Sequence, residues 1–235
     1  MTVRHERTTL AVDLEHYPQR VWDDAAYRTH RNMVRKATRL GFQFGVLAPR
    51  FGELDWFCKM YEKTQDRLEA VEETRFSATY FSELLRALGD NVWLGTVSKA
   101  KEIVSAVIVF RGSEFAHCHL MGYTAEGSGS GVSNLLYHGV AEQAASQGLR
   151  LLHMGGGLTK ADGDALYRFK SSFAHEKFDY CIGTRCHDPA AFASLRSAWE
   201  QSHGPTNSDF FLFYRLPREP AASRHEITRS QPVTT

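Results

Sequence analysis

Three strand-like runs in the middle of the chain constrain the fold more than any other feature. Residues 92–98, 103–110 and 115–121 are rich in β-branched and aromatic residues, and only the short polar breaks 99–102 and 111–114 separate them. Breaks of this length join neighbouring antiparallel strands, because parallel strands need a crossover of a dozen or more residues. The sequence therefore predicts an antiparallel meander.

Helical and extended segments flank this meander. Apolar residues at spacings of three and four predict helices over 53–68 and 77–88 before it, and a helix over 132–147 after it. The other expected elements are an extended entry at 8–14, a helix over 20–40, a strand at 42–48, a strand at 149–154, a helix over 164–172, a strand near 178–183, a helix over 189–202 that begins at Pro189, and a closing aromatic strand at 209–216. This order predicts a mixed α/β fold with a βα-crossover finish, unlike the alternating doubly wound nucleotide-binding folds.

Composition excludes several functional classes. The chain has 235 residues, of which 23% are charged, and its net charge is +1, so nothing global demands a nucleic acid partner. No stretch approaches the roughly 18 apolar residues of a membrane span, and the N-terminus has no apolar signal segment. The four cysteines form no CxxC pair, which disfavours a zinc ribbon. We expect a cytoplasmic protein with no membrane partner. The sequence makes no prediction about the oligomeric state.

A basic helix lies near the N-terminus. On a helical wheel its four arginines fall within about 80° of one another, opposite the apolar residues Met33, Ala37 and Leu40. Such a stripe suits the phosphates of a tRNA, although a solvated helix face explains it equally well. The basic residues in question are Arg28, Arg31, Arg35, Lys36 and Arg39.

The segment HMGGGLTKADGDALYRFKSSF, residues 153–173, carries the strongest chemical signal. Three glycines at the end of a buried strand make either a tight loop or a place where a substrate approaches the backbone. On the helix that follows, Lys170 is either an exposed lysine or the stabiliser of a developing oxyanion. His153 could accept a proton from an attacking ammonium or be a satisfied core histidine, and Asp164 could be catalytic or a helix cap.

This segment resembles the C-terminal half of the Fem aminoacyl-tRNA-dependent transferases, in a short form with a single GNAT-like domain. The matching residues are Gly155, Gly156, Gly157, Asp164, Leu166, Phe169, Lys170 and Phe173. A second match, RNMVRKATRLGFQF at residues 31–44, resembles the basic helix that precedes the second GNAT-like domain of those enzymes. The resemblance covers about residues 28–184. It implies a GNAT-like mixed sheet with flanking helices and a helical N-terminal extension.

The resemblance also implies an activity: transfer of an amino acid from aminoacyl-tRNA to an amine. By this likeness Lys170 stabilises the oxyanion and Phe169 packs at the reacting end of the donor. The residues expected to bind substrate are Gly155, Gly156, Gly157, His153, Asp164 and Arg168. No protein nucleophile is needed because the amine attacks, and no cofactor is expected beyond aminoacyl-tRNA as co-substrate. The family's first domain has no counterpart here, which favours a small peptide-like acceptor, as in the biosynthesis of peptidyl nucleoside antibiotics.

Two other functions stay open on the same fold. The GSGSG of residues 127–131 lies where acyl-CoA-dependent GNAT enzymes bind pyrophosphate, although residues 123–131 lack the usual arginine. The chain could therefore be an acyl-CoA-dependent N-acyltransferase that uses acetyl-CoA or another acyl-CoA, or a silent binding module. His117 and His119 share one strand face, but no third ligand has recognisable spacing, so no metal site is expected.

The domain boundaries follow from these segments. We expect an N-terminal extension over residues 1–50, a GNAT-like domain over residues 51–217 and a disordered tail over residues 218–235.

Overall fold

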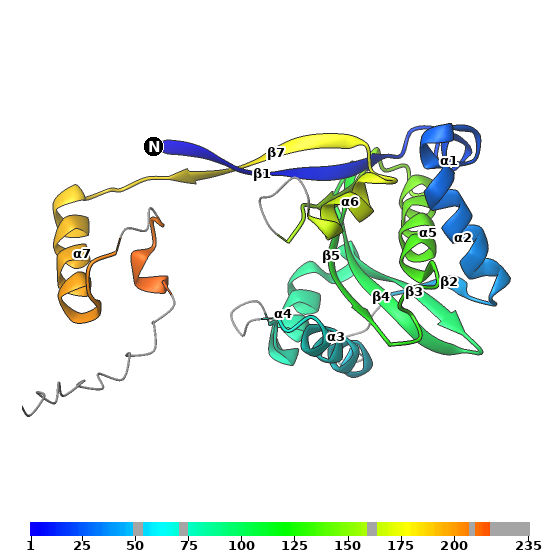
Figure 1. Cartoon of the computed structure of the whole chain (residues 1–235), viewed down its shortest axis with the longest axis horizontal. Coiled ribbons are helices and arrows are strands. Elements are labelled where there is room, and N and C mark those ends of the chain that lie inside the picture. The colour runs from blue at the N-terminus through cyan, green and yellow to red at the C-terminus, as the bar shows by residue number, and fades with distance from the viewer. Residues whose placement is uncertain (49–53, 71–74, 159–163, 207–209, 217–235) are drawn as a thin grey trace, which may run out of the picture. The chain divides into compact units, whose positions relative to one another are not determined.

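The computed structural model describes residues 1–48, 54–70, 75–158, 164–206 and 210–216 (Figure 1). Its contacts group into two compact units. The larger comprises His5–Cys181, and the smaller comprises Met1–Arg4 with Ile182–Thr235. Both expected domain boundaries, at residues 50/51 and 217/218, fall outside the described residues and stay predictions, as does the tail.

A seven-stranded mixed sheet runs in the order β2-β3-β4-β5-β6-β1-β7. Its strands are β1 (Thr2–Asp13), β2 (Gln43–Leu47), β3 (Val92–Lys99), β4 (Glu102–Arg111), β5 (Phe115–Tyr123), β6 (Leu151–Gly155) and β7 (Glu176–Thr184). The helices are α1 (Gln19–Asp23), α2 (Arg28–Arg39), α3 (Asp55–Arg67), α4 (Ala78–Leu88), α5 (Val132–Ser146), α6 (Ala165–Ser171) and α7 (Pro189–His203). The antiparallel meander is confirmed as β3-β4-β5, and the mixed α/β class is confirmed with it.

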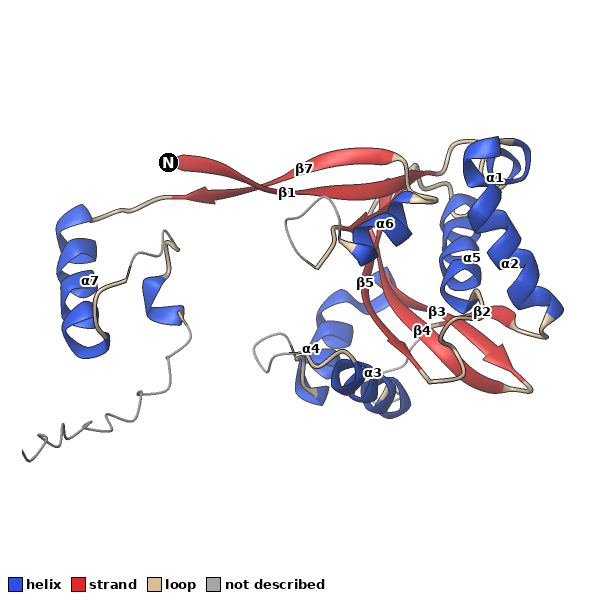
Figure 2. Cartoon of the chain, viewed as in Figure 1, coloured by secondary structure: helices blue, strands red, loops and turns tan. Residues whose placement is uncertain are grey.

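Helices cover both faces of the sheet in the larger unit (Figure 2). Alternating side chains of β4 divide between two cores, because successive residues of a strand point to opposite faces. Val107 and Val109 pack with α2 and α5, whereas Ala106 and Ile108 pack with α3 and α4.

One pair of neighbouring strands, β5 and β6, runs parallel and is connected through α5. Their pairing covers only Phe115↔Leu151, Ala116↔Leu152 and His117↔His153. Both strands continue beyond it, β5 to Tyr123 and β6 to Gly155. The strands therefore part just after the two histidines, and the glycine segment follows on the β6 side of the opening.

The helix expected over 20–40 is interrupted. A 3-10 turn at Ala25–Tyr27 separates α1 from α2, and the Asp24 side chain accepts a hydrogen bond from the Ala26 amide at 2.8 Å. An aspartate that caps a new helix start competes with continuation of the previous helix, which is why one helical pattern became two helices.

The buried stripe of α2 also differs from the expectation. It consists of His30, Val34 and Ala37, while Leu40 caps the helix and is 46% exposed. The helical wheel assigned the buried face from hydrophobicity alone and therefore did not include His30. This histidine is buried because Asn134 of α5 forms a hydrogen bond with its ring nitrogen at 3.0 Å.

The aromatic strand expected at 209–216 is wrong. In the smaller unit, Phe213–Arg215 forms a 3-10 turn, and the buried Phe213 packs against Phe192 and Trp199 of α7. Aromatic residues favour strands only where a neighbouring strand accepts them, and here a helix buries them. The start of α7 at Pro189 is confirmed, with Asp188 accepting from the Ala191 amide at 2.9 Å.

None of the helices in the described ranges is long and apolar enough to cross a membrane.

Candidate functional site

Lys170 is a buried lysine, not an exposed one. Its side chain comes from the last turn of α6, only 8% of the residue is exposed, and Nζ donates a hydrogen bond to the Gly156 carbonyl at 2.8 Å. Burial lowers the pKa of Lys170, while nearby Cys118 and Asp164 act in the opposite direction. The sequence thus places a desolvated ammonium against the glycine segment, beside the opening between β5 and β6.

The three glycines leave room for the protein's own atoms. Gly155 has a φ of +70°, and a Cβ on Gly156 would lie 3.0 Å from Arg7 Cδ. A Cβ on Gly157 would lie 2.6 Å from Asp164 Oδ1, closer than real contacts allow. These approaches give the tight-loop interpretation a physical basis. Approach of a substrate stays a prediction, and residues 159–163 of the loop lie outside the described residues.

Asp164 is the cap of α6. Its Oδ1 accepts from the Tyr167 amide and its Oδ2 accepts from the Leu158 amide, both at 2.9 Å. Both carboxylate oxygens are therefore engaged in holding the loop against the helix. The position still serves the site, because this cap fixes where α6 begins and hence where Lys170 points.

The side chains of the two other candidate residues on α6, Phe169 and Arg168, lie away from that of Lys170. Phe169 packs in the core, with ring centroids 5.3 Å from Phe173 and 6.1 Å from Tyr137. Arg168 is exposed, and two residues along a helix correspond to about 200° of rotation, so it lies on the opposite side from Lys170.

His153 lies against His117 across the last rung of the parallel pair. Their Nδ1 atoms are 2.8 Å apart and their rings stack with centroids 4.9 Å apart. Burial, the partner histidine, His119 and Lys170 lower the pKa of His117 to about 4, and burial and Lys170 lower that of His153. We call His117 and His153 the histidine pair. From sequence, His117 was considered only as half of a metal motif with His119, because nothing local indicates that β6 brings a second histidine to it.

His119 is satisfied separately, since its Nε2 lies 2.6 Å from the Tyr80 hydroxyl. Within the described ranges, no three His, Cys, Asp or Glu side chains are placed to hold a metal ion.

A pocket of about 560 Å³ opens beside the histidine pair, on the sheet face opposite α5. Apolar side chains form most of its wall. We call it the histidine pocket; its lining residues are Ala11, Phe110, Arg111, Gly112, Phe115, Ala116, His117, Leu151, His153 and Phe178. A concave, mostly apolar site with a few polar groups is typical of small-molecule sites.

The basic residues of α2 divide into two groups. Arg31 donates from Nη1 to the carbonyls of Val21 and Asp24, at 2.8 and 2.7 Å, so it ties α2 to α1. The exposed members are Arg28, Arg35, Lys36 and Arg39, and none forms an ion pair with another described residue. Arg35 lies 5.2 Å above the Trp22 ring, and with Arg39 it borders a second pocket of about 620 Å³.

The glycines of the 127–131 loop also have structural reasons. A Cβ on Gly127 would lie 2.7 Å from the Val104 carbonyl oxygen, and one on Gly131 would lie 2.4 Å from that of Met33. Gly131, at φ +80°, precedes α5 without a side-chain cap.

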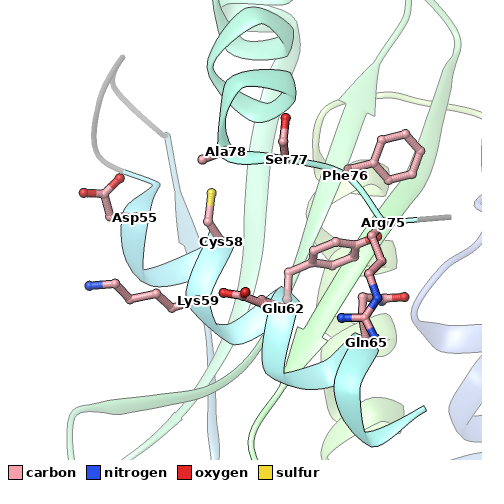
Figure 3. Close-up of a pocket in the computed structure, with 10 residues that line it drawn as sticks. Asp55, Cys58, Lys59, Glu62, Gln65, Arg75, Phe76, Ser77 and Ala78 are labelled. Carbon is pink, nitrogen blue, oxygen red and sulfur yellow. The ribbon is translucent and has the colours of Figure 1, made fainter. Parts of the chain in front are cut away.

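A third, polar pocket of about 440 Å³ lies between α3 and the segment before α4 (Figure 3). Glu62 and Arg75 line it, with Arg75 extending beside Gln65, and the Cys58 thiol faces Ser77 and Ala78. Burial raises the pKa of Cys58, so this thiol is a poor nucleophile. The pocket lacks the Lys170 and histidine chemistry of the β5–β6 opening.

Residues 25–171 match the family described as acetyltransferase (GNAT) domain. The chain belongs to this GNAT family. The match spans the meander, the crossover through α5 and the glycine segment as far as Ser171, and it confirms the GNAT-like fold expected from the sequence.

Solved structures with the same fold are distant in sequence. One, described as the C-terminal domain (DUF2156) of a lysylphosphatidylglycerol synthetase from Agrobacterium fabrum, is 16% identical with a TM-score of 0.61 over 87% of this chain and 67% of that one. L-PGS from Bacillus licheniformis is 17% identical with a TM-score of 0.59 over 83% and 65%. FemX is 14% identical with a TM-score of 0.60 over 76% and 62%. The GNAT chain thus spans about two thirds of the length of these structures, and no curated protein matches it.

Proposed function

We propose that this GNAT chain transfers an amino acid from aminoacyl-tRNA to the amine of a small peptide-like acceptor. The observation that carries the proposal is Lys170, a buried ammonium beside a glycine segment at the point where β5 and β6 part. The resemblance of this segment to the Fem transferases and the fold shared with FemX favour the same reaction.

The chemistry needs a charge stabiliser rather than a protein nucleophile. When the amine attacks the aminoacyl ester, negative charge develops on the carbonyl oxygen. Lys170 would shift its hydrogen bond from the Gly156 carbonyl toward that oxygen, and its effect is large because the ammonium is desolvated. Phe169 would order the donor end only through the aromatic core that supports α6, since it packs there. His153, whose pKa the charge of Lys170 helps to lower, could accept the amine's proton.

The tRNA would lie along α2. Arg28, Arg35, Lys36 and Arg39 present four exposed cationic side chains on one helix, and each phosphate contact adds salt-dependent affinity. The Trp22 ring beneath Arg35 adds an aromatic surface next to them.

The second candidate is acyl-CoA-dependent N-acylation. It is favoured by the acetyltransferase family match and by the GSGSG loop that leads into the N-terminus of α5, a position suited to phosphates. Assignment to antibiotic biosynthesis and to the cytoplasm stays a prediction.

The deciding experiment offers both donors. The purified chain is incubated with a pool of charged tRNAs and, separately, with acetyl-CoA, each with a mixture of small peptides, and donor consumption is followed. We expect deacylation of one or a few tRNAs that requires the peptides and is lost in Lys170→Met. Consumption of acetyl-CoA with untouched tRNAs would replace the first function by the second.

A further inference from the structure

The histidine pocket combines apolar walls with a single fixed charge. Phe115 and Phe178 are 50% and 45% exposed, so two large aromatic rings face the opening without covering it. Exposed apolar side chains gathered around a pocket mark a binding site more often than chance. Among the described residues that line it, only Arg111 carries a fixed charge.

Arg111 is placed to receive an anion. It lies at the C-terminal end of β4, is exposed, and forms no ion pair with any residue in the described part of the chain. In the sheet, Arg111 pairs with Ala116, and Ala116 pairs with Leu152, next to His153. These partners belong to the core on the α5 face, so Arg111 leaves β4 on that face and borders the histidine pocket where the strand ends. The backbones of Arg111 and His153 are about two strand spacings apart, roughly 9.5 Å. Two to three extended residues, at roughly 3.3–3.6 Å each, span that distance.

One of the two tautomer arrangements of the histidine pair leaves His153 able to act as a general base. A bond between two Nδ1 atoms requires one ring to donate and the other to accept. If His153 donates, its Nε2 carries a free lone pair, and His117 holds that tautomer as the third member of a triad holds the base. The charged and titratable groups that act on the pair are His119 of β5 and Lys170 of α6. Arg111 of β4 borders the same pocket, and β1 and β7 contribute Ala11 and Phe178.

We propose that the histidine pocket binds the acceptor as a short peptide. Its free N-terminal amine meets Nε2 of His153, its apolar first side chain lies among Phe110, Phe115 and Phe178, and its C-terminal carboxylate pairs with Arg111. His153 is then a catalytic residue and His117 a positioning residue. The transfer step rests on the function proposed above, whereas the binding of the peptide does not.

The step balances without a further reactant. The N-terminal ammonium gives one proton to Nε2 of His153, and the resulting amine attacks the ester carbonyl and forms the N–C bond. The tetrahedral intermediate, its oxyanion facing Lys170, expels the ribose oxygen as the C–O bond breaks. The nitrogen loses its second proton, and the ribose oxygen gains one, so that the products are an amide and a free hydroxyl.

Binding is tested on the full chain without any donor. Calorimetry measures the affinity of Leu-Ala-Ala, of its C-terminal amide and of its N-acetyl form. We expect the free acid to bind at least tenfold more tightly than either derivative. Arg111→Gln should remove the difference between acid and amide, whereas Arg86→Gln, at an exposed arginine on α4, should keep it. Equal binding of acid and amide to the unaltered chain would overturn the proposal even if charged tRNA is consumed.

The histidine pair is tested through rate and pH. With whichever donor the chain uses, His153→Gln should lower kcat for Leu-Ala-Ala by on the order of 10²–10⁴ and change its KM less than threefold. His117→Phe removes the acceptor that stabilises the His153 imidazolium, so the acid limb of kcat should move to lower pH. A structural role alone would not move that limb, and an unchanged limb with intact turnover would exclude His117 as a positioning residue.

Discussion

The chemistry proposed for this GNAT chain depends on Lys170, whose side chain is buried. The ammonium group of a lysine is usually hydrated, and Lys170 taken alone favoured an exposed position. Among the described residues its Nζ has one hydrogen-bond partner, the Gly156 carbonyl at 2.8 Å, and burial lowers its pKa. A cation with few partners in a desolvated place can stabilise a transient anion strongly, because little water competes for it.

Lys170→Met should separate catalysis from stability. Loss of the ammonium should slow the chemical step by on the order of 10²–10³. The melting temperature should change little, because the lost hydrogen bond is offset by relief of the buried charge. Single-turnover rates beside thermal melts measure both. A Met variant with unchanged chemistry would remove Lys170 from the mechanism.

The activity should also fall at alkaline pH because of Lys170. Its lowered pKa means that the ammonium loses its proton below the ordinary lysine value of about 10.4, and the neutral amine cannot stabilise an oxyanion. Single-turnover rates between pH 7 and 10.5 should show this basic limb. Lys170→Arg should lose the limb, since a guanidinium stays charged, while remaining slow because its planar fork places the charge differently.

Gly157 should be sensitive to the smallest substitution. Its missing Cβ makes way for Asp164 Oδ1 at 2.6 Å, so Gly157→Ala should displace the cap of α6 and lower the free energy of unfolding by about 1–2 kcal/mol. Gly129→Ala is the comparison, since its φ of +75° imposes backbone strain while its Cβ would meet nothing within 4 Å, whereas Gly157 has no positive φ. Urea unfolding of both variants separates the cost of the contact from the cost of backbone strain. A Gly157→Ala variant as stable as the unaltered chain would show that the contact with Asp164 carries no cost.

At the scale of elements, α2 both holds the domain together and presents charge. Its buried face carries His30 and Val34 against α5, while Arg31 ties it to α1 through two backbone carbonyls. The remaining basic residues are exposed. Substitutions on the two faces of α2 should therefore affect different properties, stability on one face and tRNA binding on the other.

Arg31→Ala and Arg35→Ala should have opposite phenotypes. Arg31→Ala loses two hydrogen bonds to carbonyls and should lower the melting temperature by several degrees. Arg35→Ala should leave the melt nearly unchanged and flatten the slope of log K for tRNA binding against log salt by about 1. Binding measured from 50 to 200 mM salt decides it. A slope that Arg35→Ala leaves unaltered would mean that this face of α2 does not contact phosphate.

The α2–α5 interface should make stability depend on acid. Burial lowers the pKa of His30 to about 3, whereas an unfolded histidine titrates near 6.5. Below pH 6.5, therefore, His30 is protonated in the unfolded chain but stays neutral in the folded chain. The free energy of unfolding then falls by about 1 kcal/mol for each unit by which the pH is lowered. Above pH 6.5 this contribution is complete. Urea unfolding at pH 7.5, 5.5 and 4.5 should show a shallower loss in His30→Met than in the control His187→Gln.

At the scale of the whole molecule, the chain forms two compact units. The larger has two hydrophobic cores on either side of a sheet. In the smaller, α7 and the residues after it bury aromatic rings around Phe213. Units with separate cores have separate stabilities, so local damage need not spread.

Phe213→Ala should therefore loosen only the smaller unit. Removal of this buried ring leaves Phe192 and Trp199 without their common partner, at a cost of about 3–5 kcal/mol. Hydrogen exchange read by mass spectrometry should show faster exchange in α7 and unchanged exchange in β3–β5 and α5. Acceleration across all of these elements would mean that the two units unfold together.

The sequence by itself determined what depends on local patterns. Alternating apolar residues and short polar breaks predicted β3, β4 and β5, and the glycine and Phe-Lys segment indicated the candidate site. Tertiary structure decided what depends on partners far along the chain. His117 meets His153 only because α5 returns the chain parallel to β5, and Arg111 joins them only through the sheet. The aromatic run before residue 217 lost its expected strand because strand propensity needs a neighbouring strand, and α7 supplied a helix instead. Burial likewise turned Lys170 from a surface residue into a desolvated cation, and burial is a property of the fold rather than of any local pattern.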